Sequence, residues 1–368
     1  MIEQTPTPAS CQTRRAWRLF RRVVVLALVI TLGWYGFGRI VAPLRAVRIV
    51  GPGQSVQPDA AAEVARSPDA GDTTAGAAVP PAAPPARPPR AAAQNTLRLV
   101  TWNIAHGRGL HESNFTGEVR DTRLARLAAI ARTLKELNAD IVILNEADFD
   151  CSWSHRVNQA KVIASEAGYP WRAEQRNFDA SIPFFAMRFG NAVLSRWPIR
   201  HVERIDHPAA RWWQAALAGW KRGLLAVIDV PGLGRLNVVA AHLDQSAMEE
   251  ETRIASAESI RERLKRDDLP AIIAGDLNTA PPGFPRVVAK RLERTALSVF
   301  TDDGAFHTLP VADPAPEDAT YPAPDPKRVI DWILVPSGWR INSRRVVVTD
   351  LSDHALVVME VGVGRVVR

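Results

Sequence analysis

The sequence predicts an α/β domain in which two mixed sheets pack together with helices outside, preceded by a membrane helix and an unfolded linker. Short apolar runs alternate with segments of helical periodicity over residues 95–368. Two of these runs, 223–230 and 236–242, follow each other with no helix between them, so we expect antiparallel pairs rather than a doubly wound parallel sheet. The region before residue 95 has a different composition and is expected to lie outside the domain.

The first 44 residues have the pattern of a membrane anchor. Residues 1–22 form a basic tail that ends in five closely spaced arginines, and an apolar run follows at 23–44 with only Arg39 inside it. This run has about the length needed to cross a bilayer. The arginines predict a cytoplasmic N-terminus and an extracytoplasmic domain, on the periplasmic side in a bacterium. A cleaved signal peptide is the main alternative, and a buried globular helix is another.

Residues 45–94 are expected to form an unfolded linker. Proline, alanine and glycine fill 27 of the 44 positions from 51 to 94, which leaves few side chains to build a core. The net charge of +7 is also local, because residues 1–50 carry eight arginines and one glutamate, whereas residues 95–368 carry 35 basic and 34 acidic residues. The near-neutral domain gives no sign of a broad nucleic-acid-binding surface.

The elements of the domain are expected in the following order. Strands are predicted at 97–104, 140–145, 193–195, 223–230, 236–242, 271–274, 329–335 and 355–361. One helix is predicted after Asp121, where leucines recur at three- and four-residue spacing, and a second at 156–167. A third is predicted to follow the capping-box pattern of Ser246 and Glu249 and to end near residue 266.

Many of these strands begin or end at polar side chains. The groups are Asn103, Asn145 with Glu146, His242 with Asp244, Asp276 with Asn278, Asp331, and Asp353 with His354. Because strand ends on one edge of a sheet converge, we expect them to share a pocket. Carboxylate and amide oxygens favour Mg²⁺ or Mn²⁺, and two histidines oriented by acids can act as general acid and base. A surface turn or an Asx turn explains each group singly, but not all of them in one chain.

Seven segments resemble the endonuclease/exonuclease/phosphatase superfamily. They are TWNIAHG (101–107), DIVILNEAD (140–148), GNAVLSRWPI (190–199), NVVAAHLD (237–244), IIAGDLNTAP (272–281), VIDWILV (329–335) and LSDHALVV (351–358). The superfamily includes pancreatic-type deoxyribonuclease, abasic-site endonucleases, neutral sphingomyelinases and inositol polyphosphate 5-phosphatases. The resemblance covers about 97–361 and implies a four-layer α/β/β/α sandwich.

The resemblance also implies roles for eight residues. The metal-binding positions are Asn103, Glu146 and Asp353, and the catalytic positions are His242, Asp276, Asn278, Asp331 and His354. Asp276 and Asn278 match the pair that positions water and phosphate, and Asp331 the acid that orients the catalytic His354. His242 matches the second histidine of the deoxyribonuclease-like and sphingomyelinase-like branches, where abasic-site endonucleases use a tyrosine. The branch of abasic-site endonucleases is therefore not favoured.

The expected activity is hydrolysis of phosphodiester bonds by a membrane-anchored enzyme that uses Mg²⁺ or Mn²⁺. Three tryptophans within 211–221 suit a membrane interface, although packing over the edge of the sandwich is the ordinary interpretation. With the anchor, they favour lipid or other small phosphodiesters as substrates. The alternatives are an extracytoplasmic DNA or RNA endonuclease and a catalytically idle binding module, and no obligate protein partner is inferred.

Overall fold

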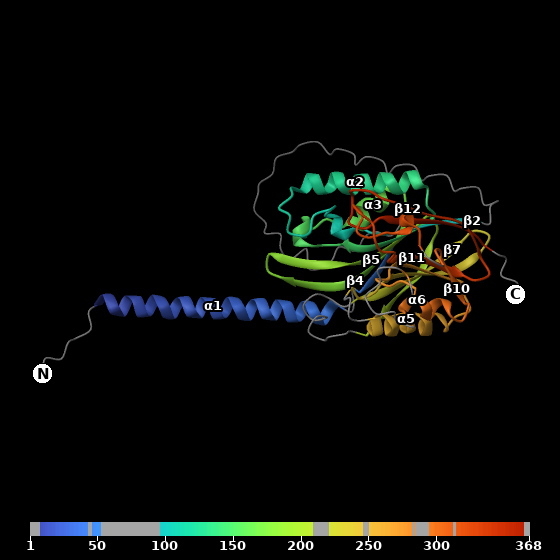
Figure 1. Cartoon of the computed structure of the whole chain (residues 1–368). Coiled ribbons are helices and arrows are strands. Elements are labelled where there is room, and N and C mark those ends of the chain that lie inside the picture. Colours follow the sequence, from blue (N-terminus) through green and yellow to red (C-terminus); the bar gives the residue numbers. More distant parts are fainter. Residues whose placement is uncertain are drawn as a thin grey trace.

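The computed structural model describes residues 8–42, 46–52, 96–208, 221–245, 250–281, 284, 294–311 and 314–363. In this part of the chain two sheets pack face to face, with α2 (Arg120–Leu137) and α3 (Gln159–Ala167) over one and α5 (Glu250–Leu264) and α6 (Ala296–Thr301) over the other (Figure 1). The expected four-layer α/β/β/α sandwich is confirmed.

Both sheets are mixed. The first has the order β1 (Val47–Val50), β4 (Trp171–Ile182), β5 (Phe185–Ser195), β3 (Ile141–Asp148), β2 (Thr96–Asn103), β13 (Leu356–Gly362) and β12 (Arg340–Val347). The second has the order β10 (Phe306–His307), β11 (Asp331–Pro336), β9 (Ala271–Asp276), β8 (Gly234–His242), β7 (Arg222–Val230) and β6 (Ile199–Asp206). Only β2 with β3 and β8 with β9 run parallel among the described pairs of strands. Single turns of 3₁₀ helix lie at Ala105–Gly107, Ser152–Ser154 and Pro316–Asp318.

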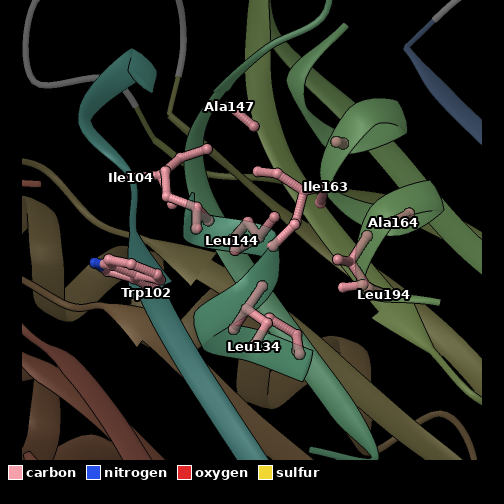
Figure 2. Packing of buried hydrophobic residues seen from close by; sticks show 14 of the residues in the cluster. Trp102, Ile104, Leu134, Leu144, Ala147, Ile163, Ala164 and Leu194 are labelled. Atoms are coloured by element: carbon pink, nitrogen blue, oxygen red, sulfur yellow. The ribbon is translucent and has the colours of Figure 1, made fainter. Parts of the chain in front are cut away.

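Three apolar layers hold the sandwich together. Between the sheets, Leu99 and Ile143 of the first face Val238 and Ile272 of the second, all of them fully buried. Outside the first sheet, side chains such as Trp102 and Leu144 pack against α2 and α3, as Figure 2 shows. A third cluster joins the second sheet to α5 and α6. Burial on both faces explains why β3, β8 and β9 read as apolar runs, whereas β2 alternates apolar and polar residues over its first half.

The two parallel pairs bring the polar strand ends together. Asn103 stands opposite Asn145 in the first sheet, and His242 stands opposite Asp276 in the second. Asp331, which begins β11, also lies beside Asp276. Since the sheets are stacked, these ends meet at one edge of the sandwich, as the sequence predicts.

The N-terminal region differs from expectation in two ways. Helix α1 runs from Pro8 to Val41 instead of 23–44, because the arginine-rich tail consists largely of good helix formers. Its segment Leu19–Gly38 is long and apolar enough to cross a membrane. The predicted linker at 45–94 contains a strand: Val47–Val50 forms β1, which pairs with β4. The other linker positions from 53 onward lie outside the described residues, as do the tryptophans at 212, 213 and 220 and the Ser246 and Glu249 pattern.

Candidate active site

A carboxylate of the second sheet and an amide of the first sheet meet at the centre of the site. Asn103 Nδ2 donates a hydrogen bond to Asp276 Oδ2 (3.1 Å), and both side chains are buried. Burial raises the pKa of Asp276, despite the opposing effect of His354. Asn278 follows with φ of 50° and donates its backbone N–H to Asp276 Oδ1 (3.1 Å), which is an Asx turn as well as part of the site.

His354 and Asp331 form a buried acid–imidazole pair. Nδ1 of His354 lies 3.0 and 3.2 Å from the two carboxylate oxygens of Asp331, and its Nε2 lies 3.7 Å from Asp276 Oδ2. Burial alone would lower the pKa of His354, but the carboxylates of Asp331 and Asp276 outweigh it and raise this pKa to about 10. Trp102 Nε1 donates to the backbone oxygen of His354 (3.0 Å) and so holds this segment against β2.

The second histidine, His242, has a lysine as its partner. Nζ of Lys221 lies 2.7 Å from Nε2 of His242, whose side chain is 1% exposed. Burial and the neighbouring ammonium lower the pKa of His242 well below its ordinary range. These effects favour the neutral imidazole, a nitrogen of which can accept a hydrogen bond from the Lys221 ammonium; Nζ lies 3.3 Å from Nδ1 as well. Nε2 also lies 3.7 Å from an oxygen of both Glu146 and Asp276.

A β-bulge directs Glu146 into the site. Asn145 and Glu146 together oppose a single residue of β5, because the register passes from Leu144 paired with Ala192 to Ala147 paired with Gly190. Glu146 takes a φ of 52° there. Bulges of this kind re-aim side chains beside functional sites. Burial would raise the pKa of Glu146, but the neighbouring side chains of His106 and Lys221 lower it below its ordinary range.

Arg108 lies between two predicted metal ligands. Its Nη2 donates to Asp353 Oδ2 (2.5 Å), and its Nη1 lies 3.7 Å from Glu146 Oε2. The carboxylates of Glu146 and Asp353 both approach the guanidinium of Arg108, and the buried Oδ1 of Asp353 has no donor among the described residues. Two such carboxylates suit a divalent ion, which prefers hard oxygen ligands. Asn103, the third predicted ligand, contacts Asp276 and the backbone of Ala105.

A second candidate metal position is formed by Asp276, Asp331 and His354, whose candidate ligand atoms lie within 4.8 Å of one another. A buried group of this kind could hold a metal ion. Nδ1 of His354 is already within hydrogen-bonding distance of Asp331, however, and an ion bound there would have to break that pair. An ion at Glu146 and Asp353 would likewise have to replace the guanidinium of Arg108, so both positions are candidates.

The loop after β2 is folded tightly beneath the site. Ala105, His106 and Gly107 all have positive φ, which costs free energy for the first two residues. Buried side chains compensate: Gln159 Nε2 and Arg123 Nη1 both donate to the backbone oxygen of His106 (2.7 and 3.2 Å). The ring of His106 is then fixed between Asp148 Oδ1 at 2.7 Å and Glu146 Oε2 at 3.4 Å.

A chain of buried amides connects the two sheets behind the site. Asn145 Oδ1 accepts the backbone N–H of Asp276 (2.9 Å), and Asn145 Nδ2 donates to Asn191 Oδ1 (2.9 Å) and to the backbone oxygen of Ala241 (3.1 Å). Asn191 continues the chain to Gln175 Oε1 (2.9 Å). Asn145 thus fixes the position of β9 relative to β3.

We expect Asn145→Ala to lower the free energy of unfolding by roughly 3 kcal/mol, because it removes the acceptor of the Asp276 N–H and the donor to Asn191 Oδ1 in a buried place. Guanidinium denaturation followed by tryptophan fluorescence measures this. Asn342→Ala, on the exposed face of edge strand β12, is the matched control and should change stability by less than about 0.5 kcal/mol. Equal small effects of both substitutions would contradict a structural role for the amide chain.

The structure brings the eight predicted site residues to one edge of the sandwich, where each contacts another of them or shares a neighbour. It adds others that the sequence did not single out as site residues: Lys221, Arg108, Asn191 and Tyr321, whose ring lies 4.7 Å from that of His354. The position of Lys221 had a signal in the sequence, because a tight hairpin between 222–230 and 234–242 brings it near His242. No periodic pattern in the sequence could predict the position of Arg108, because it lies in a loop.

The fold and the site together define a hydrolase-type α/β/β/α domain with paired histidines and carboxylates at one sheet edge. The sequence profile of the endonuclease/exonuclease/phosphatase family matches residues 100–354, and the chain belongs to this family. Members of the family hydrolyse phosphoester bonds and are generally dependent on divalent metals. No curated protein matches the chain significantly.

Solved structures of the same family are similar in fold. An endonuclease/exonuclease/phosphatase from Beutenbergia cavernae is 24% identical, with a TM-score of 0.55 over 73% of this chain and 72% of that one. The human nocturnin catalytic domain with bound sulfate is 16% identical, with a TM-score of 0.52 over 72% and 93%. A mannosyl-6-phosphatase from Bacteroides thetaiotaomicron is also 16% identical, with a TM-score of 0.52 over 72% and 99%. Identities this low support the shared fold alone.

Proposed function

We propose that this chain is a membrane-anchored, divalent-metal-dependent phosphodiesterase. The observation that carries the proposal is the convergence of the Asp331–His354 pair, the Asn103–Asp276 pair and the carboxylates of Glu146 and Asp353 at one sheet edge. A divalent ion, Mg²⁺ or Mn²⁺, held by Glu146 and Asp353 with Asn103 nearby, would neutralise charge on the phosphate oxygens. The residues around it supply the rest of the chemistry.

The side chains have different roles in hydrolysis. Asp276 and Asn278 orient a water molecule toward phosphorus, and His354, oriented by Asp331, donates a hydrogen bond to a phosphate oxygen as its charge grows. In the tautomer whose Nε2 accepts a hydrogen bond from Lys221, this nitrogen of His242 has no proton to give. The geometry therefore favours Lys221 over His242 as the proton donor on that side of the site. The sequence alone allows either histidine as general acid, so this assignment departs from that expectation for His242.

Two observations support a membrane location. The segment Leu19–Gly38 of α1 is apolar and largely exposed, as expected for a helix in lipid. Five arginines cluster just before it and in its first turn, at positions 14, 15, 18, 21 and 22, which favours a cytoplasmic N-terminus and a catalytic domain on the opposite side. With the domain in that location, substrates at a membrane surface, such as phospholipids, are more accessible to the site than chromosomal DNA. A nuclease that degrades extracytoplasmic DNA or RNA is the second candidate, because the family includes nucleases.

The test is turnover of bis-p-nitrophenyl phosphate by the full-length chain in detergent, with and without EDTA, beside supercoiled plasmid. The full chain is needed because β1 precedes the domain boundary at 95. EDTA-sensitive release of nitrophenol with intact plasmid is the expected result. Rapid nicking of plasmid would favour the nuclease instead. A folded protein that turns over neither substrate would refute the proposal and favour a binding module.

A further inference from the structure

The tip of the β4–β5 hairpin exposes an aromatic side chain almost completely. Phe184 is 98% exposed and has a φ of 70°, a conformation that costs energy for a bulky side chain. Phe115, in the loop before α2, is 68% exposed, and its ring stacks on that of Phe185 at the hairpin tip, with centroids 6.4 Å apart. Neither the exposure of these rings nor the backbone strain at Phe184 stabilises the fold. We therefore consider that the exposed rings bind an apolar partner outside the chain.

The hairpin tip points along the apolar helix. Trp34 Nε1 of α1 donates to Ser181 Oγ near the end of β4 (3.4 Å), whereas Ala46, after α1, accepts from the backbone of Arg176 (2.9 Å). Strand β1 then pairs with β4 still further from the tip, at 172–175. On the way from α1 to β1, the N-terminal segment therefore contacts β4 first near the hairpin tip and then nearer its base. The N-terminal part of α1 extends past the hairpin, as Figure 1 shows.

This order fixes the level of the tip relative to the proposed membrane span. Trp34 lies in the last turns of the segment Leu19–Gly38, where an interfacial tryptophan is expected. Phe184 is three residues beyond Ser181, so it lies up to about 10 Å further toward the bilayer centre. That distance reaches the boundary between head groups and acyl chains.

A row of aromatic rings leads from the tip to the site. Trp153 lies within 5.6–6.3 Å of Phe115 and Phe185, and its ring centroid is 5.9 Å from that of His106. His106 is also in edge contact with Phe189 (5.0 Å), and its Nε2 lies 3.4 Å from Glu146. An apolar surface thus begins at the membrane level and ends at the carboxylate proposed to hold the metal ion.

We propose that the hairpin tip and Phe115 insert into the membrane interface beside α1, and that the site takes its substrate from the phospholipids of that same bilayer. This inference rests on the proposed phosphodiesterase function and names its substrate class. In the reaction, water adds to phosphorus and one ester oxygen leaves with a proton, so a phospholipid yields a phosphomonoester and an alcohol. The commitment to lipid follows from the continuity of the tip with the apolar surface of α1.

The catalytic test compares one substrate in a membrane with one in water. The full-length chain is reconstituted in nanodiscs of phosphatidylcholine and phosphatidylglycerol (about 3:1), with Mg²⁺, and phosphomonoester formation is followed by ³¹P NMR. Phe184→Ser should lower lipid turnover by about tenfold or more and leave turnover of bis-p-nitrophenyl phosphate unchanged. Val348→Ser is the matched control, since Val348 is 53% exposed at the opposite edge of the sheet, after β12.

A direct measurement of depth accompanies it. A fluorophore on Phe184→Cys, in a chain with Cys11→Ser, should be quenched by brominated lipids, whereas one on Val348→Cys should not. A fluorophore at position 184 that is shielded from water but not quenched by brominated lipids would mean that the tip binds a protein. A disulfide between the introduced tip cysteines of two unlabelled copies would mean the same, and either result would overturn the inference. Failure to cleave lipid while bis-p-nitrophenyl phosphate is cleaved would overturn this inference alone, and failure on both substrates would overturn the proposed function as well.

Discussion

His354→Ala is expected to lower turnover of bis-p-nitrophenyl phosphate by about 10²- to 10⁴-fold, the usual contribution of a positioned acid or base. The reason is that His354 lies 3.7 Å from Asp276 and its ring is held by Asp331, whereas His242, at the same distance from Asp276, has Lys221 as its hydrogen-bond partner. Initial rates at saturating Mg²⁺ measure the effect.

The matched control for His354 is His201→Ala, because His201 lies exposed on β6 and should leave the rate unchanged. Asp331→Asn should lower the rate less than His354→Ala, since it keeps the ring but weakens its orientation. A His354→Ala protein that is folded and retains more than about a tenth of the wild-type rate would remove His354 from the mechanism.

The second large effect concerns the metal ion. EDTA should reduce turnover to background, and Mg²⁺ should restore it. Glu146→Gln should need at least about ten times more Mg²⁺ for half-maximal rate, because changes in the outer shell of a metal site alone cost about 10- to 100-fold. Calorimetric titration of Mg²⁺ into both proteins measures the same difference without relying on activity.

Glu166→Gln, on the exposed side of α3, is the control for the metal prediction and should bind Mg²⁺ like the wild type. If Glu146→Gln also binds Mg²⁺ normally, the ion is held elsewhere, and the buried group of Asp276, Asp331 and His354 becomes the better site. The two outcomes therefore distinguish the two candidate positions.

The sequence predicted the centre of the sandwich well and its edges poorly. Strands β3, β8 and β9 are buried on both faces, so their apolar runs are visible, and β2 is visible from its alternating pattern; the polar residues that end these strands define the site. Strand β4 was not expected, because Gln175, Asn177 and Asp179 interrupt its pattern; these polar side chains are buried and have partners both within β4 and in β5 and β7. Edge strand β12 was not expected either, since most of its side chains are exposed or only half-buried.

Residues that act through loops could not be predicted from periodicity. Arg108 reaches Asp353, which is 245 positions away in the sequence, only because the strained turn at 105–107 directs the chain back over β3. The bulge at Glu146 is similar, since no feature of DIVILNEAD shows that two residues will oppose one. Both features depend on tertiary packing, which a single sequence does not encode in its local pattern.

Strand β1 has a consequence for how an anchored enzyme would meet its substrate. Because Val47–Val50 pairs with β4 shortly after α1, the residues that leave the proposed membrane helix are already part of the catalytic sheet. The enzyme then has no long tether, and it cannot sample the volume above the bilayer. The quantity that sets its rate would be the number of substrate molecules per unit area of membrane around the anchor, and diluting the surrounding solution would leave that rate unchanged.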